Sequence, residues 1–213
     1  MISEELQHLL LQYCEPESEL LQHIDRETNL KVLMPRMLSG HYQGRVLSML
    51  SKMANPKRIL EVGTYTGYAT LCLAEGLTAD GIIYTLDINV ELEEMVRVNF
   101  AKSPLNDKIN YIIGDAQESL KALSNETFDL VFIDADKKNN QTYYDLVFDQ
   151  VKPGGIIIVD NVLWSGKVLQ NSQDKDTKNI TNFNDYVNAD HRVEKLILPV
   201  RDGLFVIRKT PNP

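Results

Sequence analysis

The chain has 213 residues, of which 43% are hydrophobic and 24% are charged, an ordinary composition for a globular protein with a full core. No apolar run approaches the roughly 20 residues of a membrane-spanning helix, so we expect no association with a membrane. The net charge of -8 disfavours a protein that coats nucleic acid. The two cysteines lack metal-ligand spacing and the first residues lack the order of a signal peptide, so we expect a cytoplasmic protein.

The chain begins with helical periodicity. Apolar residues recur at helical spacing within 3–13, and a second helix is expected after Glu15-Pro16-Glu17. A third helix is predicted over 42–54, with Val46, Leu47, Leu50 and Met53 facing inward. We expect these helices, within residues 1–56, to form a lid over the loop that follows the first strand.

From residue 57 the pattern changes to strands that alternate with helices. The predicted strands cover 58–62, 82–87, 109–113, 129–134 and 155–160, and the predicted helices cover 67–77, 90–101, 116–123 and 139–150. This alternation predicts an α/β fold with a parallel sheet covered on both faces. Two further apolar segments, 193–200 and 204–208, flank Arg201-Asp202-Gly203 and predict an antiparallel hairpin. We expect residues 1–213 to form a single domain with a mobile loop at 170–176.

Residues 58–68 have the pattern of a strand ending in an acid, a turn with Gly63 and Gly67, and a helix start. Glycine permits a sharp turn or the close approach of a ligand, and the N–H groups of a helix start favour an electron-rich ligand. A purely structural turn explains the same residues. The Glu-x-Gly-x-x-x-Gly spacing differs from that of dinucleotide binders, which argues against an NAD-dependent oxidoreductase.

The next two strands also end in acids. Asp87 follows Gly63 by about 24 residues, near the spacing at which an acid reaches ribose hydroxyls. Asp115 follows the third strand and could accept a hydrogen bond from an adenine amino group. Either residue could instead cap the helix that follows it.

The fourth and fifth strands end in a richer set of polar groups. Asp134 and Asp160 would lie about one strand spacing apart, ~4.8 Å, if their strands are neighbours. Two carboxylates that close repel unless a proton or a cation lies between them. With the carbonyl of Asn161 they form a set of hard oxygen ligands suited to Mg²⁺, Mn²⁺ or Ca²⁺, although independent helix caps remain an alternative. Lys137 could act as a general base beside a cation or could be a solvated charge.

These segments, in this order, resemble the cation-dependent class I O-methyltransferases, the family of catechol and caffeoyl-CoA O-methyltransferases and their small bacterial relatives. The resemblance covers roughly residues 30–209. The matching residues are Met37 and Gly44, Glu61-Val62-Gly63-Thr64-Tyr65-Thr66-Gly67-Tyr68, Asp87-Ile88-Asn89, Gly114-Asp115-Ala116, Asp134-Ala135-Asp136-Lys137, Pro153-Gly154-Gly155, Asp160-Asn161-Val162-Leu163-Trp164 and Asp202-Gly203.

The resemblance implies a Rossmann-like fold with a seven-stranded, mostly parallel sheet, helices on both faces, an antiparallel C-terminal hairpin and an N-terminal helical lid over the core of 57–213. It also implies S-adenosylmethionine as methyl donor. The residues that would bind this cofactor are Met37, Ser39, Glu61, Gly63, Tyr65, Gly67, Tyr68, Asp87, Asp115, Ala116 and Asp134. A divalent cation would be held by Asp134, Asp160 and Asn161, and Lys137, with Asp134, would carry the catalysis.

The function implied is methyl transfer to a hydroxyl of a catechol-like small molecule. An alternative acceptor is a hydroxylated wobble uridine of tRNA, because residues 28–60 contain basic residues but no acid. A solvated helix face explains that stretch equally well. Family members are commonly homodimers, and the apolar N-terminal helices could form such a contact.

The sequence departs from the family pattern at Asn140, where relatives commonly have tyrosine, and this change could alter the packing of the following helix. Trp164 could line the acceptor pocket or simply pack. No substrate signature is visible in the first 30 residues or in 161–175.

Overall fold

The computed structural model describes residues 4–170 and 174–211, and the chain divides into two compact parts on either side of the junction between Ala116 and Gln117. We describe each part by itself. The prediction of a single domain therefore stays a prediction. Seven strands form a mostly parallel sheet whose last two strands are an antiparallel pair, with helices around it, so the predicted fold class is confirmed.

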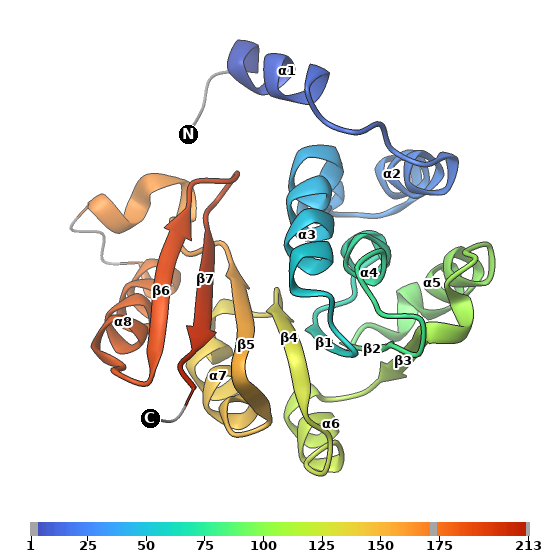
Figure 1. Ribbon diagram of the computed structural model, residues 1–213. Coiled ribbons are helices and arrows are strands. Elements are labelled where there is room, and N and C mark those ends of the chain that lie inside the picture. The colour runs from blue at the N-terminus through green and yellow to red at the C-terminus, as the bar shows by residue number, and fades with distance from the viewer. Residues whose placement is uncertain (1–3, 171–173, 212–213) are drawn as a thin grey trace. The chain divides into compact units, whose positions relative to one another are not determined.

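The N-terminal part begins with helices, as predicted. Helices α1 (Glu4–Gln12) and α2 (Glu19–Lys31) precede the short turn η1 (Pro35–Met37) and the longer helix α3 (Gly40–Ala54). Ser18 starts α2 because its side chain accepts a hydrogen bond from the N–H of Leu21. Figure 1 shows this order in blue and cyan.

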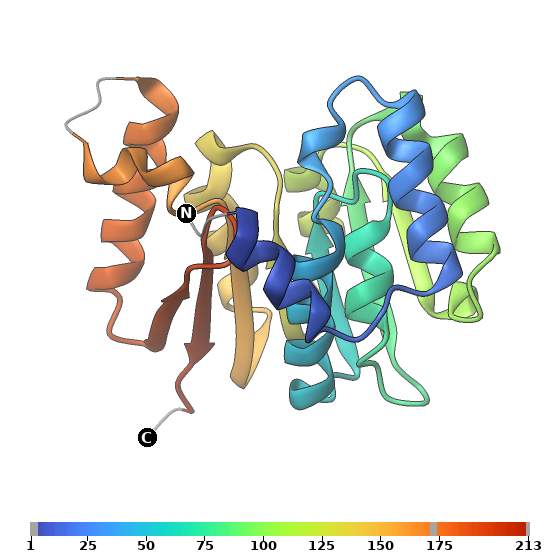
Figure 2. The same ribbon diagram turned by 90° about the horizontal axis from the view of Figure 1, so that it is seen from above.

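Helix α3 packs side by side with α4 (Tyr68–Ala74) (Figure 2). Its buried face differs from the one predicted. Met53 is 68% exposed rather than inward, whereas Ser51 is buried and donates to the carbonyl of Leu73 over 2.6 Å. A Cβ atom on Gly44 would lie 2.7 Å from the ring of Tyr68. Small and polar residues therefore face α4 because they let the two helices approach closely.

The strands of the N-terminal part are β1 (Arg58–Val62), β2 (Ile82–Asp87) and β3 (Ile109–Ile113), at the predicted positions. They are parallel and ordered β3-β2-β1. Between them lie α4, the turns η2 (Val90–Leu92) and η3 (Asn106–Lys108), and helix α5 (Glu93–Ala101). Parallel order places the carboxyl ends of the strands, including Val62 and Asp87, at one edge.

The C-terminal part contains β4 (Phe128–Ile133), β5 (Val151–Asp160), β6 (Val193–Leu198) and β7 (Leu204–Lys209), in the order β4-β5-β7-β6 (Figure 1). Its helices are α6 (Ala116–Ala122), α7 (Asn140–Phe148) and α8 (Lys175–Ala189), with the turns η4 (Lys137–Asn139) and η5 (Trp164–Leu169). Strands β4 and β5 are parallel, and β5 pairs antiparallel with β7. The predicted hairpin is therefore confirmed.

Helix α8 was not predicted, and it shortens the loop expected at 170–176. Asp174 caps α8 by accepting from the N–H and the hydroxyl of Thr177 over 2.9 and 2.7 Å, and the helix begins at Lys175. The centre of that expected loop, 171–173, lies outside the described residues. No helix among the described residues is both long and apolar enough to cross a membrane.

Candidate functional site

The turn between β1 and α4 adopts backbone conformations that require its glycines. The φ angles of Gly63, Tyr65 and Gly67 are 107°, 52° and 85°. A Cβ atom on Gly67 would lie 2.5 Å from the ring of Phe100. The structural explanation of these glycines is therefore correct, and it is compatible with a ligand-binding turn.

The N–H groups of this turn donate to protein acceptors. Those of Gly63 and Thr64 donate to the Leu86 carbonyl over 2.9 and 3.2 Å, and that of Gly67 donates to the Thr64 carbonyl over 2.9 Å. These three N–H groups therefore already have protein acceptors. The helix α4 itself begins at Tyr68, so the expectation that the N–H groups of the helix start favour an electron-rich ligand stays a prediction.

Glu61, near the carboxyl end of strand β1, places a carboxyl group in a fully buried position beside this turn. Its Oε2 atom accepts from the hydroxyls of Thr70 and Thr85. Thr64 and Thr85 also share a hydrogen bond of 2.6 Å between their hydroxyls. This network fixes the carboxylate beside the glycine turn, where a fixed negative charge suits a cationic or hydrogen-bond-donating ligand.

Asp87, at the end of β2, is bound directly to the same turn. Its Oδ2 atom accepts from the Tyr65 N–H over 2.6 Å, and its Oδ1 atom accepts from the Asn89 N–H over 2.9 Å. Each carboxylate oxygen can accept a further hydrogen bond. The carboxylate therefore supports the turn and keeps acceptor capacity for a diol.

Residues of the N-terminal helices also contact the turn. Thr28 of α2 is buried and donates to the Thr66 hydroxyl over 3.0 Å. The Tyr65 hydroxyl donates to the Met34 carbonyl over 2.8 Å, and burial raises the pKa of this phenol. These bonds join the predicted lid segment to the glycine turn.

The other residues predicted to bind the cofactor differ in burial and in their contacts. Met37 is exposed beside this contact, and Ser39 is buried at the start of α3. Tyr68 is buried and its hydroxyl donates to Glu17, and burial and the nearby acidic groups raise its pKa. Asp115 is exposed directly before α6, which starts at Ala116. Because the Tyr68 hydroxyl already donates to a protein acceptor, it is a weak candidate for a hydrogen bond to a ligand.

In the C-terminal part, the ends of β4 and β5 meet as predicted. Ile133 pairs with Val159 in the parallel register, so Asp134 and Asp160 are the next residues along two neighbouring strands. Asp160 is only 4% exposed. Asn161 has a φ of 63°, and its N–H donates to Oδ1 of Asp160 over 2.6 Å.

Lys137 pairs with Asp134, one of these two acids. Its Nζ donates to Oδ1 of Asp134 over 2.8 Å, and the two side chains are only 14% and 20% exposed. Asp136, by contrast, accepts from the Tyr143 hydroxyl and the Asn139 amide over 2.6 and 2.7 Å. Asp136 therefore stabilises the loop between β4 and α7 through these hydrogen bonds. Asp134 and Lys137, in contrast, form a partly buried ion pair after the end of β4.

The chemistry of the donor set fits a hard divalent cation. Asp134 and Asp160 supply carboxylate oxygens and Asn161 supplies an amide oxygen, which are ligands that Mg²⁺ and Ca²⁺ accept. The described residues contain no group of three or more His, Cys, Asp and Glu side chains placed to hold a metal ion. The predicted ligand set contains only two side chains of these four types, Asp134 and Asp160, so that search does not test it. Cation binding therefore stays a prediction.

Asn184 was not singled out from the sequence, and the surroundings of Asp202 and Asn140, which were, could not be read from it. Asn184 of α8 donates to the Val162 carbonyl over 2.8 Å, and Asp202 accepts from the Ser165 N–H over 2.5 Å. Asn140 is 1% exposed, and its amide atoms have no hydrogen-bond partner within the described part of the chain. The departure at Asn140 was visible as a residue type, but its burial was not. Asn184 gave no signal because α8 itself was not predicted.

Comparison with known proteins identifies the family of the chain. The sequence model of the O-methyltransferase family matches residues 12–210. Caffeoyl-CoA O-methyltransferase of Petroselinum crispum is 36% identical over 205 residues, which cover 91% of this chain and 85% of that protein. Catechol O-methyltransferase of Mycobacterium tuberculosis is 36% identical over 143 residues, covering 67% of this chain and 65% of that protein.

The solved structures give the same result. The O-methyltransferase from Bacillus cereus in complex with SAH aligns with a TM-score of 0.89 at 29% identity, over 97% of each chain. A SAH-bound methyltransferase from Podospora anserina aligns with a TM-score of 0.87 at 28% identity, over 99% of this chain and 97% of that one. The chain therefore belongs to the O-methyltransferase family.

Proposed function

We propose that this protein transfers the methyl group of S-adenosylmethionine to a hydroxyl of a catechol-like small molecule with the help of a divalent cation. The observation that carries the proposal is the placement of Asp134 and Asp160 at adjacent strand ends, with Lys137 2.8 Å from Asp134 and Asn161 next to Asp160. The named relatives that act on caffeoyl-CoA and catechol support a small phenolic acceptor.

The N-terminal part would bind the methyl donor. Glu61, Gly63, Tyr65 and Gly67 would surround its methionine portion, where the carboxylate of Glu61 is held by the Thr70 and Thr85 hydroxyls. Asp87 would accept hydrogen bonds from the ribose hydroxyls. Additional contacts are proposed for Met37, Ser39, Tyr68, Asp115, Ala116 and Asp134. The SAH complex of the Bacillus cereus relative supports this ligand class.

The C-terminal part would provide the reacting groups. Asp134, Asp160 and Asn161 would hold Mg²⁺, Mn²⁺ or Ca²⁺, and such a cation lowers the pKa of a coordinated hydroxyl. Lys137, as the neutral amine, would accept the hydroxyl proton at Nζ. Asp134, 2.8 Å away, would then stabilise the resulting ammonium. The acceptor oxygen forms a bond to the methyl carbon as the carbon–sulfur bond breaks, so positioning supplies much of the catalysis.

A tRNA acceptor has less support from the structure than from the sequence. Lys31 and Lys57 pair with Glu27 and Asp80. Arg45 and Lys52 both pair with Glu75. Acids that lie outside residues 28–60 in the sequence thus neutralise much of the basic charge of this stretch, so a phosphate-binding surface there would be weak. The family match also favours methyl transfer over an NAD-dependent oxidation.

We also propose that the protein forms a homodimer through its N-terminal helices. Leu6 and Leu9 of α1 and Met49 and Met53 of α3 are exposed, and α1 packs on α3. Sedimentation should then show a dimer, and Leu9→Glu should shift it toward the monomer. A wild-type chain that sediments as a monomer at all concentrations would contradict this proposal.

A methyl-transfer assay tests the proposed activity. Labelled S-adenosylmethionine is incubated with catechol, caffeoyl-CoA, flavonoids, and hydroxylated or unmodified tRNA, with and without EDTA. We expect methylation of a catechol-type acceptor that EDTA abolishes and Mg²⁺ restores. Turnover that EDTA leaves unchanged would overturn the role of the cation. Turnover of hydroxylated tRNA alone would replace the acceptor with the alternative one.

A further inference from the structure

The loop after β5, residues 161–166, follows a backbone path that a free chain would rarely adopt. The φ angles of Asn161, Trp164 and Ser165 are 63°, 46° and 54°. Residues other than glycine are uncommon in this region, because the Cβ atom crowds the backbone. Contacts from other elements must therefore hold this loop in place.

The turn between β6 and β7 holds one side of the loop. The N–H groups of Val162 and Leu163 donate to the carbonyls of Gly203 and Asp202 over 3.2 and 2.8 Å. Oδ1 of Asp202 accepts from the N–H and the hydroxyl of Ser165 over 2.5 and 3.2 Å. A Cβ atom on Gly203 would lie 2.5 Å from Leu163 Cγ, so turn and loop are in direct contact.

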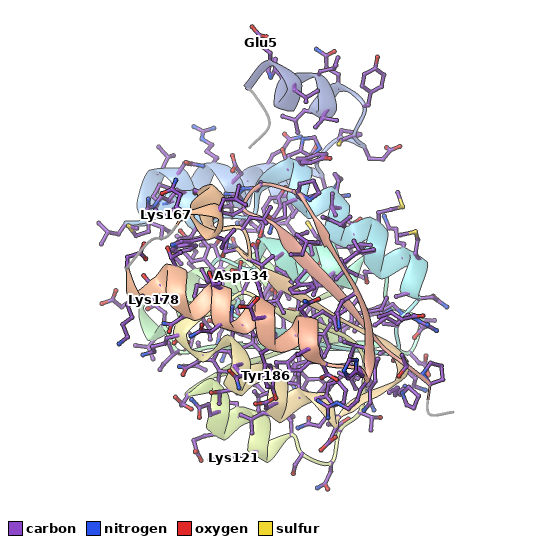
Figure 3. All side chains as sticks on the ribbon, turned by 90° about the vertical axis from the view of Figure 1, so that its left-hand side faces the viewer. Glu5, Lys121, Asp134, Lys167, Lys178 and Tyr186 are labelled. Atoms are coloured by element: carbon purple, nitrogen blue, oxygen red, sulfur yellow. The ribbon has the colours of Figure 1, made fainter. Side chains whose placement is uncertain are left out.

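Helix α8 packs against η5 and also contacts the loop through an amide. Nδ2 of Asn184 donates to the Val162 carbonyl over 2.8 Å. Oδ1 of Asn184 is buried and makes no hydrogen bond with any described residue, so Val162 is the partner that the structure gives this side chain. Phe183 and Val187 are buried on the same helix and fix its position. Helix α8 also packs against η4, which follows Asp134 (Figure 3).

We propose that Asn184 and Asp202 are positioning residues that set Asn161 for cation binding and hold Trp164 in its place. Asn161 immediately precedes Val162, whose carbonyl and N–H are both bound by these elements. A shift of this peptide would move the amide of Asn161 relative to Asp160. Groups behind the ligands of a metal commonly change its affinity by about 10- to 100-fold when they are removed. The inference rests on the proposed cation site.

Two measurements on the purified full-length protein test whether Asn184 and Asp202 hold the loop of residues 161–166. The first is the dissociation constant for Mn²⁺ measured by calorimetry without methyl donor or acceptor. The second is the fluorescence of Trp164, the only tryptophan of the chain, and its quenching by acrylamide. Because Trp164 lies in the loop, its quenching reports the loop without any metal.

Asn184→Leu removes the amide and keeps a similar volume. We expect Mn²⁺ to bind about 10-fold or more weakly and Trp164 to become more readily quenched. Asn184→Gln keeps an amide donor and should restore part of both. Asn182→Leu is the matched control, because Asn182 is exposed two residues earlier on α8, and it should leave both readouts unchanged.

Asp202→Ala provides an independent variant that loosens the loop from the other side, and it should change both readouts in the same direction. If wild-type protein binds Mn²⁺ but Asn184→Leu and Asp202→Ala bind it equally well, the inference is wrong and the proposed cation site stands. If wild-type protein binds no divalent cation, the proposed cation site fails. In that case, if Trp164 quenching were also unchanged in both variants, the inference that Asn184 and Asp202 hold the loop would be wrong.

Discussion

The substitution Glu75→Gln tests the polar contacts that hold helix α3 against the end of α4, the helix that follows the glycine turn. The Glu75 carboxylate accepts from both terminal nitrogens of Arg45 over 3.1 and 2.7 Å. It also accepts from Ser48 and Lys52 over 2.7 and 2.9 Å. Glutamine keeps the shape of the side chain but removes the charge that compensates Arg45, whose side chain is only 13% exposed.

The magnitude follows from the pKa of Glu75. Burial alone would raise this pKa, but the hydrogen bonds from Arg45, Lys52 and Ser48 offset burial and lower it from 4.5 to about 2. A difference of about 2.5 pH units corresponds to roughly 3 kcal/mol. The side chain is 27% exposed, so solvent screening reduces this value, and we expect Glu75→Gln to lose about 1–2 kcal/mol near neutral pH.

The sign of the pH dependence follows from the same values. Because the folded-state pKa is depressed, the contribution is fully present above the unfolded value of 4.5 and is lost as the pH falls toward about 2. Urea unfolding of both proteins should therefore show a difference in free energy that shrinks by more than half between about pH 6 and about pH 3.

Glu94→Gln is the control for the change in net charge, since Glu94 is exposed. It should leave the free energy of unfolding nearly unchanged at both pH values. Equal stability of wild type and Glu75→Gln near neutral pH, or a difference that does not vary with pH, would refute this reasoning.

Three further predictions concern the turn, the proposed base and the thiols. Gly67→Ala should lower the free energy of unfolding by at least about 2 kcal/mol in a urea titration, since its φ is 85° and the new Cβ would meet the Phe100 ring; wild-type stability would contradict this. Lys137→Ala should reduce kcat about 100-fold or more and alter the pH–rate profile, and an unchanged profile would exclude Lys137 as the base. Burial raises the pKa of the Cys72 thiol to about 12, so iodoacetamide should modify the half-buried Cys14 first, as followed by mass spectrometry. Equal rates of modification of the two thiols would show that Cys72 is not protected.

The strands were predictable because each is an apolar run bounded by polar or glycine residues. β1, β2 and β3 have the predicted limits, whereas β5 begins at Val151, earlier than predicted. Its Pro153-Gly154-Gly155 segment looks like a loop in the sequence, although β5 runs through it, with Gly154 at a φ of 82°. β5 pairs with β4 at Val151 and again from Ile156, with a shift of register between these pairs, so the segment is an irregularity inside a strand that is paired on both sides of it.

Helix α8 could not be predicted, because its sequence is mostly polar and only Thr177, Ile180, Phe183 and Val187 are buried. The exposure of Met53 escaped prediction for a related reason. Apolar periodicity assumes that apolar residues face the core, but α3 uses buried polar residues such as Ser51 to approach α4 closely.

At the candidate site, residue type and strand position indicated Asp87, Asp134 and Asp160, because parallel strands bring their carboxyl ends to one edge. The partners of these acids were not visible. Side-chain bonds such as that of Asn184 to Val162 join segments far apart in sequence. The positive φ angles of Trp164 and Ser165 could not be predicted from the sequence either, because neither residue type favours such angles.

The most direct test of the central claim is the affinity of Asp160→Ala for Mg²⁺, measured together with its methyl transfer to a catechol acceptor. Asp160→Ala removes a nearly buried carboxylate from the proposed ligand set. We predict that wild-type protein binds Mg²⁺ and needs it for turnover, and that Asp160→Ala loses both while it still binds S-adenosylmethionine. Full Mg²⁺-dependent turnover by Asp160→Ala would contradict the assignment of the cation to the ends of β4 and β5.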